Sequence, residues 1–209
     1  MTRFVILISS FFLFFSCKND DALQFHIKGT VNNAVTNAPI SGGKVSVYST
    51  PANSTVPKFE GSTAIASNGD YSITVDRDQY TSLQLHVEKE GYFKEITTVL
   101  FADLKAKEDN IFNLTTAARS WIRFNIRNIN NPSSSDEFKF LKSHGKQGCN
   151  GCCDNGFTFL YGELDTNITC TNDGGAYFGY YYWVNGNEVF DADSLITPPF
   201  DTLVIDIEY

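Results

Sequence analysis

The sequence is poor in the residues that build long helices. Its 209 residues include one methionine, and long stretches of Ala, Leu, Glu and Lys are missing. Gly, Thr, Ser, Asn, Val, Ile, Tyr and Phe dominate instead, as in proteins made of strands and turns. The sequence therefore predicts an all-β protein, long enough for one large or two small domains with real cores.

Positive charge is scarce. Sixteen Lys and Arg stand against 24 Asp and Glu, the formal net charge is −8, and no run of Lys or Arg occurs along the chain. The sequence therefore lacks the basic footprint that nucleic acids and anionic membrane surfaces require. We expect no nucleic acid among the partners of this protein.

Motifs of common catalytic sites are missing as well. The sequence contains no His-Glu-x-x-His, no Gly-x-Ser-x-Gly elbow, no phosphate-binding loop and no EF-hand. Its three histidines, His26, His86 and His144, stand apart, and a structural position explains each better than catalysis does. We expect a protein that is not an enzyme and needs no cofactor and no metal. A hydrolase, the alternative, would need carboxylates such as Glu163, Asp165 and Asp191 in one cleft.

The one long apolar run lies at the start of the chain. Arg3 precedes an apolar stretch from Phe4 to Phe15, which is shorter than the ~20 residues of a membrane-spanning helix. Ser16-Cys17 follows, and the whole segment resembles a bacterial lipoprotein signal. The resemblance implies that residues 1–16 are a signal peptide and that Cys17 carries a lipid, which would tether the protein to a membrane.

The residues after the expected cleavage site carry a second signal. Cys17-Lys18-Asn19-Asp20-Asp21 resembles the Lys-plus-acidic export signal of Bacteroidota lipoproteins, within an acidic tether at 17–23. That resemblance implies a lipid-anchored protein of the outer membrane, exposed at the cell surface. A solvated linker is the alternative interpretation.

Residues 24–116 consist of short alternating runs separated by turn signals. The turn signal Asn68-Gly69-Asp70 leads directly into Tyr71–Val75, because Asn and Gly tolerate positive φ. We predict a β-sandwich here. The other expected strands contain Phe25 and Ile27, Val45 to Tyr48, Leu83 to Val87, Ile96 to Leu100, and Ile111 to Leu114.

Four motifs in this region resemble carboxypeptidase regulatory-like domains, which are transthyretin-like β-sandwiches. The resemblance covers residues 24–115 and implies a non-catalytic module, so no catalytic residue carries over. The motifs are Gly29-Thr30-Val31, Ala38-Pro39-Ile40-Ser41-Gly42-Gly43-Lys44-Val45-Ser46-Val47-Tyr48, Asn68-Gly69-Asp70-Tyr71-Ser72-Ile73 and Glu90-Gly91-Tyr92.

Residues 117–209 predict a second, smaller β-sandwich with a Cys-rich loop. The alternating strands Trp121–Arg127 and Leu203–Tyr209 bound it, with further strands near 157–164 and 176–184. The join at 116–120 contains neither Pro nor Gly and is short, so we expect the two domains to pack against each other. No sequence repeat relates the two halves.

Four cysteines remain after Cys17. Outside the cytoplasm, Cys149, Cys152, Cys153 and Cys170 predict two disulfides, and because adjacent cysteines rarely bond each other, Cys152 and Cys153 should each pair with Cys149 or Cys170. Zinc is an alternative, with Cys149, Cys152 and Cys170 plus His144 or Cys153 as ligands. Redox chemistry is a further alternative.

The segment 177–183 is unusually aromatic. Side chains alternate along a strand, so Tyr177, Tyr181 and Trp183 share one face. An exposed face of this kind could stack on sugar rings, whereas a covered one would be core or domain interface. The opposite face carries Phe178, Tyr180, Tyr182 and Val184.

Two short motifs concern modification. Asp193-Ser194-Leu195 and Asp201-Thr202-Leu203 resemble the Asp-Ser/Thr-aliphatic acceptor of Bacteroidota O-glycosylation, which implies that Ser194 and Thr202 are acceptors.

Anchoring without a catalytic set predicts a non-enzymatic surface lipoprotein. It would act as a binding or accessory module for a polysaccharide, a peptide or an outer-membrane protein partner. A structural spacer or envelope-assembly component, with its aromatic residues buried between domains, is the alternative. Exposure of Tyr181 and Trp183 discriminates between the two.

Overall fold

The computed structural model describes residues 24–209, except for the side chains of residues 190–194. The expected signal peptide, the lipidation of Cys17 and the acidic tether therefore lie outside the described residues. Fifteen strands and one 3₁₀ turn, Phe101–Asp103, form the regular structure of the described part, and the prediction of an all-β fold is confirmed. Within that part, no helix is long and apolar enough to cross a membrane.

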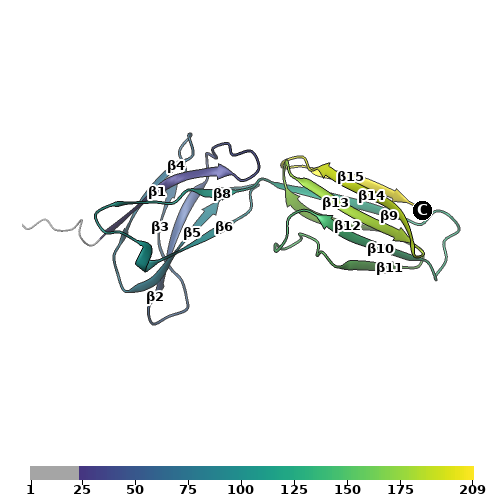
Figure 1. Ribbon diagram of the computed structural model, residues 1–209, viewed down its shortest axis with the longest axis horizontal. Helices are drawn as coiled ribbons and strands as arrows, with labels where there is room; N and C mark the ends of the chain where they lie inside the picture. The colour runs from purple at the N-terminus through teal and green to yellow at the C-terminus, as the bar shows by residue number, and fades with distance from the viewer. Residues whose placement is uncertain (1–23) are drawn as a thin grey trace, which may run out of the picture.

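Residues 24–116 fold into a first sandwich of two sheets (Figure 1). One sheet has the order β4-β1-β7, with β8 also pairing β1, and the other has the order β3-β2-β5-β6. Alternate residues of β1, including Phe25 and Ile27, are fully buried in one core with Leu83 and Leu85 of β5. The strands are β1 Gln24–Asn33, β2 Lys44–Pro51, β3 Lys58–Ala64, β4 Asp70–Asp76, β5 Tyr80–Glu88, β6 Glu95–Leu100, β7 Asp109–Ile111 and β8 Leu114–Thr116.

The second sandwich begins with β9. Its sheets have the orders β12-β9-β15 and β11-β10-β13-β14. Ile122, Phe124 and Ile126 alternate along β9 and are completely buried, and the Phe124 ring lies 4.9 Å from Phe140 and 4.7 Å from Tyr180. The strands are β9 Arg119–Arg127, β10 Glu137–His144, β11 Phe157–Tyr161, β12 Asp165–Asp173, β13 Tyr177–Val184, β14 Asn187–Ile196 and β15 Thr202–Glu208.

The two sandwiches share one topology. The order β12-β9-β15 repeats β4-β1-β7, and β11-β10-β13-β14 repeats β3-β2-β5-β6. In both, the first strand runs parallel to the last: β1 to β7 and β8, and β9 to β15. The structure therefore repeats one topology, and the repeat is not visible in the sequence because a sandwich core requires alternating apolar residues rather than particular ones.

The junction between the sandwiches is short and packed. Only Ala117 and Ala118 separate β8 from β9, and both are buried. Phe200, from the loop before β15, contacts the ring of Tyr92 at 5.3 Å. A Cβ on Gly91, which has φ of +76°, would meet the Phe200 ring at 3.0 Å, so only glycine fits there without strain. Figure 1 shows the sandwiches end to end across this junction.

Candidate functional site

The aromatic strand β13 divides its side chains between two environments. Phe178 and Tyr180 are buried in the core of the second sandwich, and Tyr182 and Val184 pack against it. On the other side of the strand, Tyr177 is exposed, and Tyr181 and Trp183 are partly exposed. Tyr181 and Trp183 therefore lie on the outer face of their sheet, and the domain core does not bury them.

The neighbouring strands extend this surface. Phe157, Phe159 and Tyr161 alternate along the edge strand β11, with exposed fractions of 52%, 46% and 63%. In the register of the sheet, Phe159 lies beside Lys139 of β10, which lies beside Trp183 of β13. The sheet thus brings two aromatic rows to the same face. We call Phe157, Phe159, Tyr161, Tyr181 and Trp183 the aromatic face.

The rings of the aromatic face form a chain of contacts. Centroid distances are 6.5 Å for Phe159–Tyr161, 6.0 Å for Phe157–Phe159, 5.6 Å for Phe157–Trp183 and 6.1 Å for Tyr181–Trp183. These spacings are typical of interacting aromatic pairs. They create one continuous apolar surface, of the kind that packs against the C–H faces of pyranose rings.

A single cation lies within this surface. The Nζ atom of Lys139 is 4.2 Å from the ring centroid of Trp183 and 4.8 Å from that of Phe157, so it bridges the two rows by cation–π contacts. The ammonium group and the Tyr161 hydroxyl can donate hydrogen bonds to sugar hydroxyls. The aromatic face therefore combines stacking area with polar groups that can orient a ligand.

Tyr177 stands apart from the aromatic face. It pairs with Ile196 of β14 near the opposite end of β13, four residues before Tyr181. Tyr177 lies on the same side of β13 as Tyr181 and Trp183, as the alternation predicted. The ring contact between Tyr181 and Trp183, however, lies toward the other end of the strand. Its assignment as a ligand-binding residue stays a prediction.

The Cys-rich loop has two disulfides: Cys149–Cys152 lies within it, and Cys153–Cys170 joins it to β12. This pairing follows the expected rule, since Cys152 and Cys153 each take a different partner. It leaves none of these four thiols available, so the proposed zinc set does not form in the structure. Among the described side chains, no three His, Cys, Asp or Glu residues converge in a way that could hold a metal ion.

A buried lysine supports this loop. Lys142, 2% exposed, donates from Nζ to the carbonyl oxygens of Lys146 at 2.7 Å, Cys152 at 2.6 Å and Cys153 at 2.5 Å. Burial lowers the pKa of Lys142 from its usual value, and the negative charge of Asp154 opposes that shift. Lys142 thus anchors the loop to β10, the strand at the centre of the aromatic face.

Replacing Lys142 with methionine tests this anchor. The variant keeps the volume but leaves three carbonyl oxygens without their donor, and we expect the free energy of unfolding to fall by about 2 kcal/mol. Urea unfolding monitored by circular dichroism measures the loss. The control is Lys139→Met on the same strand; Lys139 is only partly buried and lies on the outer face, so this variant should change stability by less than about 0.5 kcal/mol.

The remaining candidate residues are distributed over the surface. Thr202 is exposed at the start of β15. The side chain of Ser194 is not among those that the structure describes. Asp165 lines an outer hollow of about 600 Å³ with Asp206 and Glu208, where Arg127 approaches Asp165 and Glu208 at 3.7 Å. Glu163 does not line that hollow, and the side chain of Asp191 lies outside the described residues.

Of the three histidines, His86 alone is buried. His86 is buried on β5, where its ring centroid lies 4.4 Å from that of Tyr48 and its Nε2 lies 3.1 Å from Gln84 Oε1. Burial, reinforced by the charge of Lys94 and opposed by Glu88, lowers the pKa of His86 below 6.5. The fold therefore holds this imidazole in its neutral form.

The lowered pKa of His86 makes stability depend on pH. Below about pH 6.5 the unfolded chain binds a proton that the folded chain does not, so the free energy of unfolding should fall as pH drops through this range. Unfolding midpoints between pH 7.5 and 5 measure the effect. His86→Phe, which keeps a ring against Tyr48, should flatten the profile; an unchanged slope would contradict the account.

Comparison with known proteins does not place the chain in a family. No family model matches it, and no curated protein matches it. The resemblance of residues 24–115 to carboxypeptidase regulatory-like domains therefore stays a prediction.

Solved structures show distant likenesses only. Hydroxyquinol 1,2-dioxygenase from Pseudomonas putida DLL-E4 matches 47% of this chain at 12% identity and a TM-score of 0.35, and the match spans 57% of that protein. Shaft pilin SpaA from Lactobacillus rhamnosus GG, as a double mutant, matches 89% at 9% identity and a TM-score of 0.35, over 96% of its length. A streptococcal ancillary pilin matches 90% at 12% identity and a TM-score of 0.37, over 63% of its length. At these values the likenesses carry no conclusion about activity or assembly.

Proposed function

We propose that this chain is a non-enzymatic, membrane-anchored binding module whose aromatic face binds a polysaccharide. The lipid on Cys17 would hold it at the outer membrane with the sandwiches at the cell surface. The observation that carries the proposal is the solvent-facing chain of five aromatic rings with Lys139 among them. Surface area of this kind is rarely left uncovered on a protein unless it meets a partner.

The geometry favours a sugar ligand over a buried interface. Tyr181 and Trp183 lie on the outer face of the four-stranded sheet, whereas the domain junction is formed by other residues, Tyr92 and Phe200 among them. The aromatic face is a surface along two strands rather than a closed cleft, which suits an extended chain of sugar units. The rigid backbone of the sheet keeps the rings in place before binding, which limits the entropy lost on association.

A panel of soluble neutral polysaccharides tests the proposal. Affinity electrophoresis measures how far each polysaccharide in the gel retards the protein. We expect retardation by at least one of them, and its loss in Phe159→Ala and Trp183→Ala, because each ring that packs against a sugar should contribute about 1 kcal/mol. The matched control is Phe59→Ala on β3 of the first sandwich, where Phe59 is 54% exposed, close to the exposure of Phe159.

One observation supports the alternative hypothesis, a structural spacer. The packed junction, with Phe200 seated against Gly91 and Tyr92, fixes the two sandwiches relative to each other, as a spacer requires. A spacer does not need an exposed aromatic face. If no polysaccharide retards the protein and the Phe159 and Trp183 variants behave as the wild type, the spacer is the better description.

A further inference from the structure

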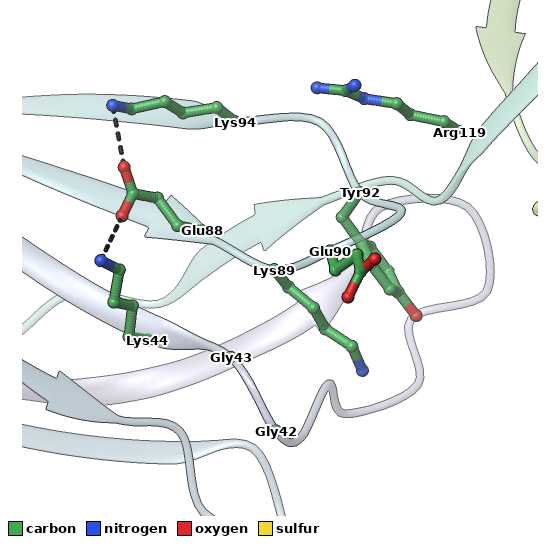
Figure 2. Close-up of a pocket in the computed structure, with 9 residues that line it drawn as sticks. All are labelled: Gly42, Gly43, Lys44, Glu88, Lys89, Glu90, Tyr92, Lys94 and Arg119. Atoms are coloured by element: carbon green, nitrogen blue, oxygen red, sulfur yellow. Dashed lines mark ion pairs between the residues drawn. The ribbon is translucent and has the colours of Figure 1, made fainter.

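The fold assembles a basic groove at the junction of the two sandwiches, although no basic run exists in the sequence. Lys44, at the start of β2, Lys89 and Lys94, on either side of the Gly91 turn, and Arg119, at the start of β9, line one hollow of about 600 Å³. Figure 2 shows these side chains around the hollow, with Tyr92 beside Lys89. Residues far apart in the chain thus place four cations together.

The groove continues into the second sandwich. Lys94 and Arg119 also line an adjoining hollow of about 410 Å³, together with Trp121 of β9 and Asn150 of the Cys-rich loop. Arg119 and Trp121 are two residues apart on one strand, so they lie on the same face of the sheet. We call Lys44, Lys89, Lys94, Arg119, Tyr92 and Trp121 the junction groove.

The charge of the groove is opposite to that of the chain. Its first hollow has four cations and two carboxylates, Glu88 and Glu90, which leaves a surplus of two positive charges in a protein of net charge −8. Lys44 and Lys94 share a single carboxylate, Glu88, at 3.0 and 2.9 Å, as the dashed lines in Figure 2 show. A surplus of this kind attracts an anion at the junction while the rest of the surface repels it.

Arg119 is the cation that the fold leaves available. It is exposed, its guanidinium lies 5.4 Å from the ring of Phe93, and no described carboxylate forms an ion pair with it. This cation–π contact with Phe93 does not use the N–H donors of the guanidinium. A guanidinium whose N–H donors form no ion pair can donate two parallel hydrogen bonds to the oxygens of a carboxylate.

We propose that the junction groove binds the carboxylate-bearing sugars of an acidic polysaccharide. Arg119 would take the carboxylate, Lys94 would add a second positive charge, and the rings of Trp121 and Tyr92 would pack against the sugar ring faces. The two hollows together offer room for more than one sugar unit. This inference goes beyond the proposed function, because it uses a different surface and requires negative charge on the ligand.

Calorimetric titration of the full chain with tetragalacturonate tests the inference, with its neutral methyl ester as the matched ligand. We expect saturable binding of the acid at low salt, weaker binding at high salt because exposed charges are screened, and about tenfold or greater loss for the ester. Arg119→Gln should weaken acid binding by about tenfold as well. Lys58→Gln, which removes one positive charge from β3 outside the groove, should leave the affinity unchanged.

Three outcomes of the titration would overturn the inference. Equal binding of acid and ester, acid binding that survives Arg119→Gln, or no binding of the acid would each contradict it. Trp183→Ala separates this proposal from the aromatic face, because it should abolish retention by neutral polysaccharides and leave acid binding intact. Arg119→Gln should have the opposite pattern, so either proposal can fail alone.

Discussion

Phe124→Ala is expected to lower the free energy of unfolding by about 3–5 kcal/mol, the largest effect of any change considered. The Phe124 ring has no exposed surface and lies within contact range of Phe140 on β10 and Tyr180 on β13. Removing it leaves a cavity between the two sheets of the second sandwich. Because β13 carries Tyr181 and Trp183 on its outer side and β10 lies between the two aromatic rows, the same change should also weaken polysaccharide retention.

Thermal and urea unfolding of Phe124→Ala measure the loss, and Phe159→Ala is the matched control. Both variants remove one phenyl ring, but Phe159 lies on the solvent side of β11. The control should unfold within about 0.5 kcal/mol of the wild type while losing polysaccharide retention. Equal destabilisation by the two variants would mean that the outer rings are part of the structural core, and the assignment of a binding face would be wrong.

Removing the Cys153–Cys170 disulfide is expected to lower the free energy of unfolding by about 3 kcal/mol, because that bond closes a loop of 17 residues in the unfolded chain. Cys170 is fully buried on β12, so the bond ties the Cys-rich loop to the sheet. The backbone N–H of Thr171 on β12 also donates to the carbonyl of Gly151 in the loop, at 2.7 Å. Cys153→Ala with Cys170→Ala avoids placing a hydroxyl in the core.

The matched control is Cys149→Ala with Cys152→Ala. That disulfide spans only three residues, so its removal should lower the free energy of unfolding by a smaller amount, about 2 kcal/mol. Urea denaturation of both double variants gives the ranking. A larger loss for the short-span pair would show that the loop is held mainly by contacts other than the Cys153–Cys170 bond.

Several strands that the sequence revealed have one buried and one solvated face. In β9, Ile122, Phe124 and Ile126 alternate with polar residues, and the alternation predicted both the strand and its buried side. Strand β10 was missed although Phe138 and Phe140 alternate in it, because the next inward position is Lys142, a cation whose partners are backbone carbonyls of a distant loop. Strand β12 was missed because only Ile168 and Cys170 interrupt its polar run.

The candidate site was predictable in part for the same reason. Alternation along β13 placed Tyr181 and Trp183 on one face. The contribution of Phe157, Phe159 and Tyr161 depends on β11 pairing with β10, and β10 with β13, at one particular register. The alternation of large rings in Phe157–Tyr161 was a local signal for an exposed aromatic row. That this row joins the other one is a property of the sheet.

The junction groove and the repeated topology illustrate what a single sequence conceals. Lys44, Lys94 and Arg119 come from three separate strands or turns, and only the packing of the two sandwiches brings them together. The common topology of the sandwiches is likewise invisible, since β1 and β9 share a burial pattern but few residue types. Tertiary arrangement, not local pattern, produced both features.

Tryptophan fluorescence measures the central claim directly, because the only two tryptophans report on different surfaces. Trp183 belongs to the aromatic face and Trp121 to the junction groove. With the neutral polysaccharide that retards the protein most, we expect a saturable change in Trp121→Phe, where Trp183 is the sole tryptophan, and no change in Trp183→Phe. A neutral polysaccharide that binds but alters only the signal of Trp121, or neither signal, would contradict binding at the aromatic face.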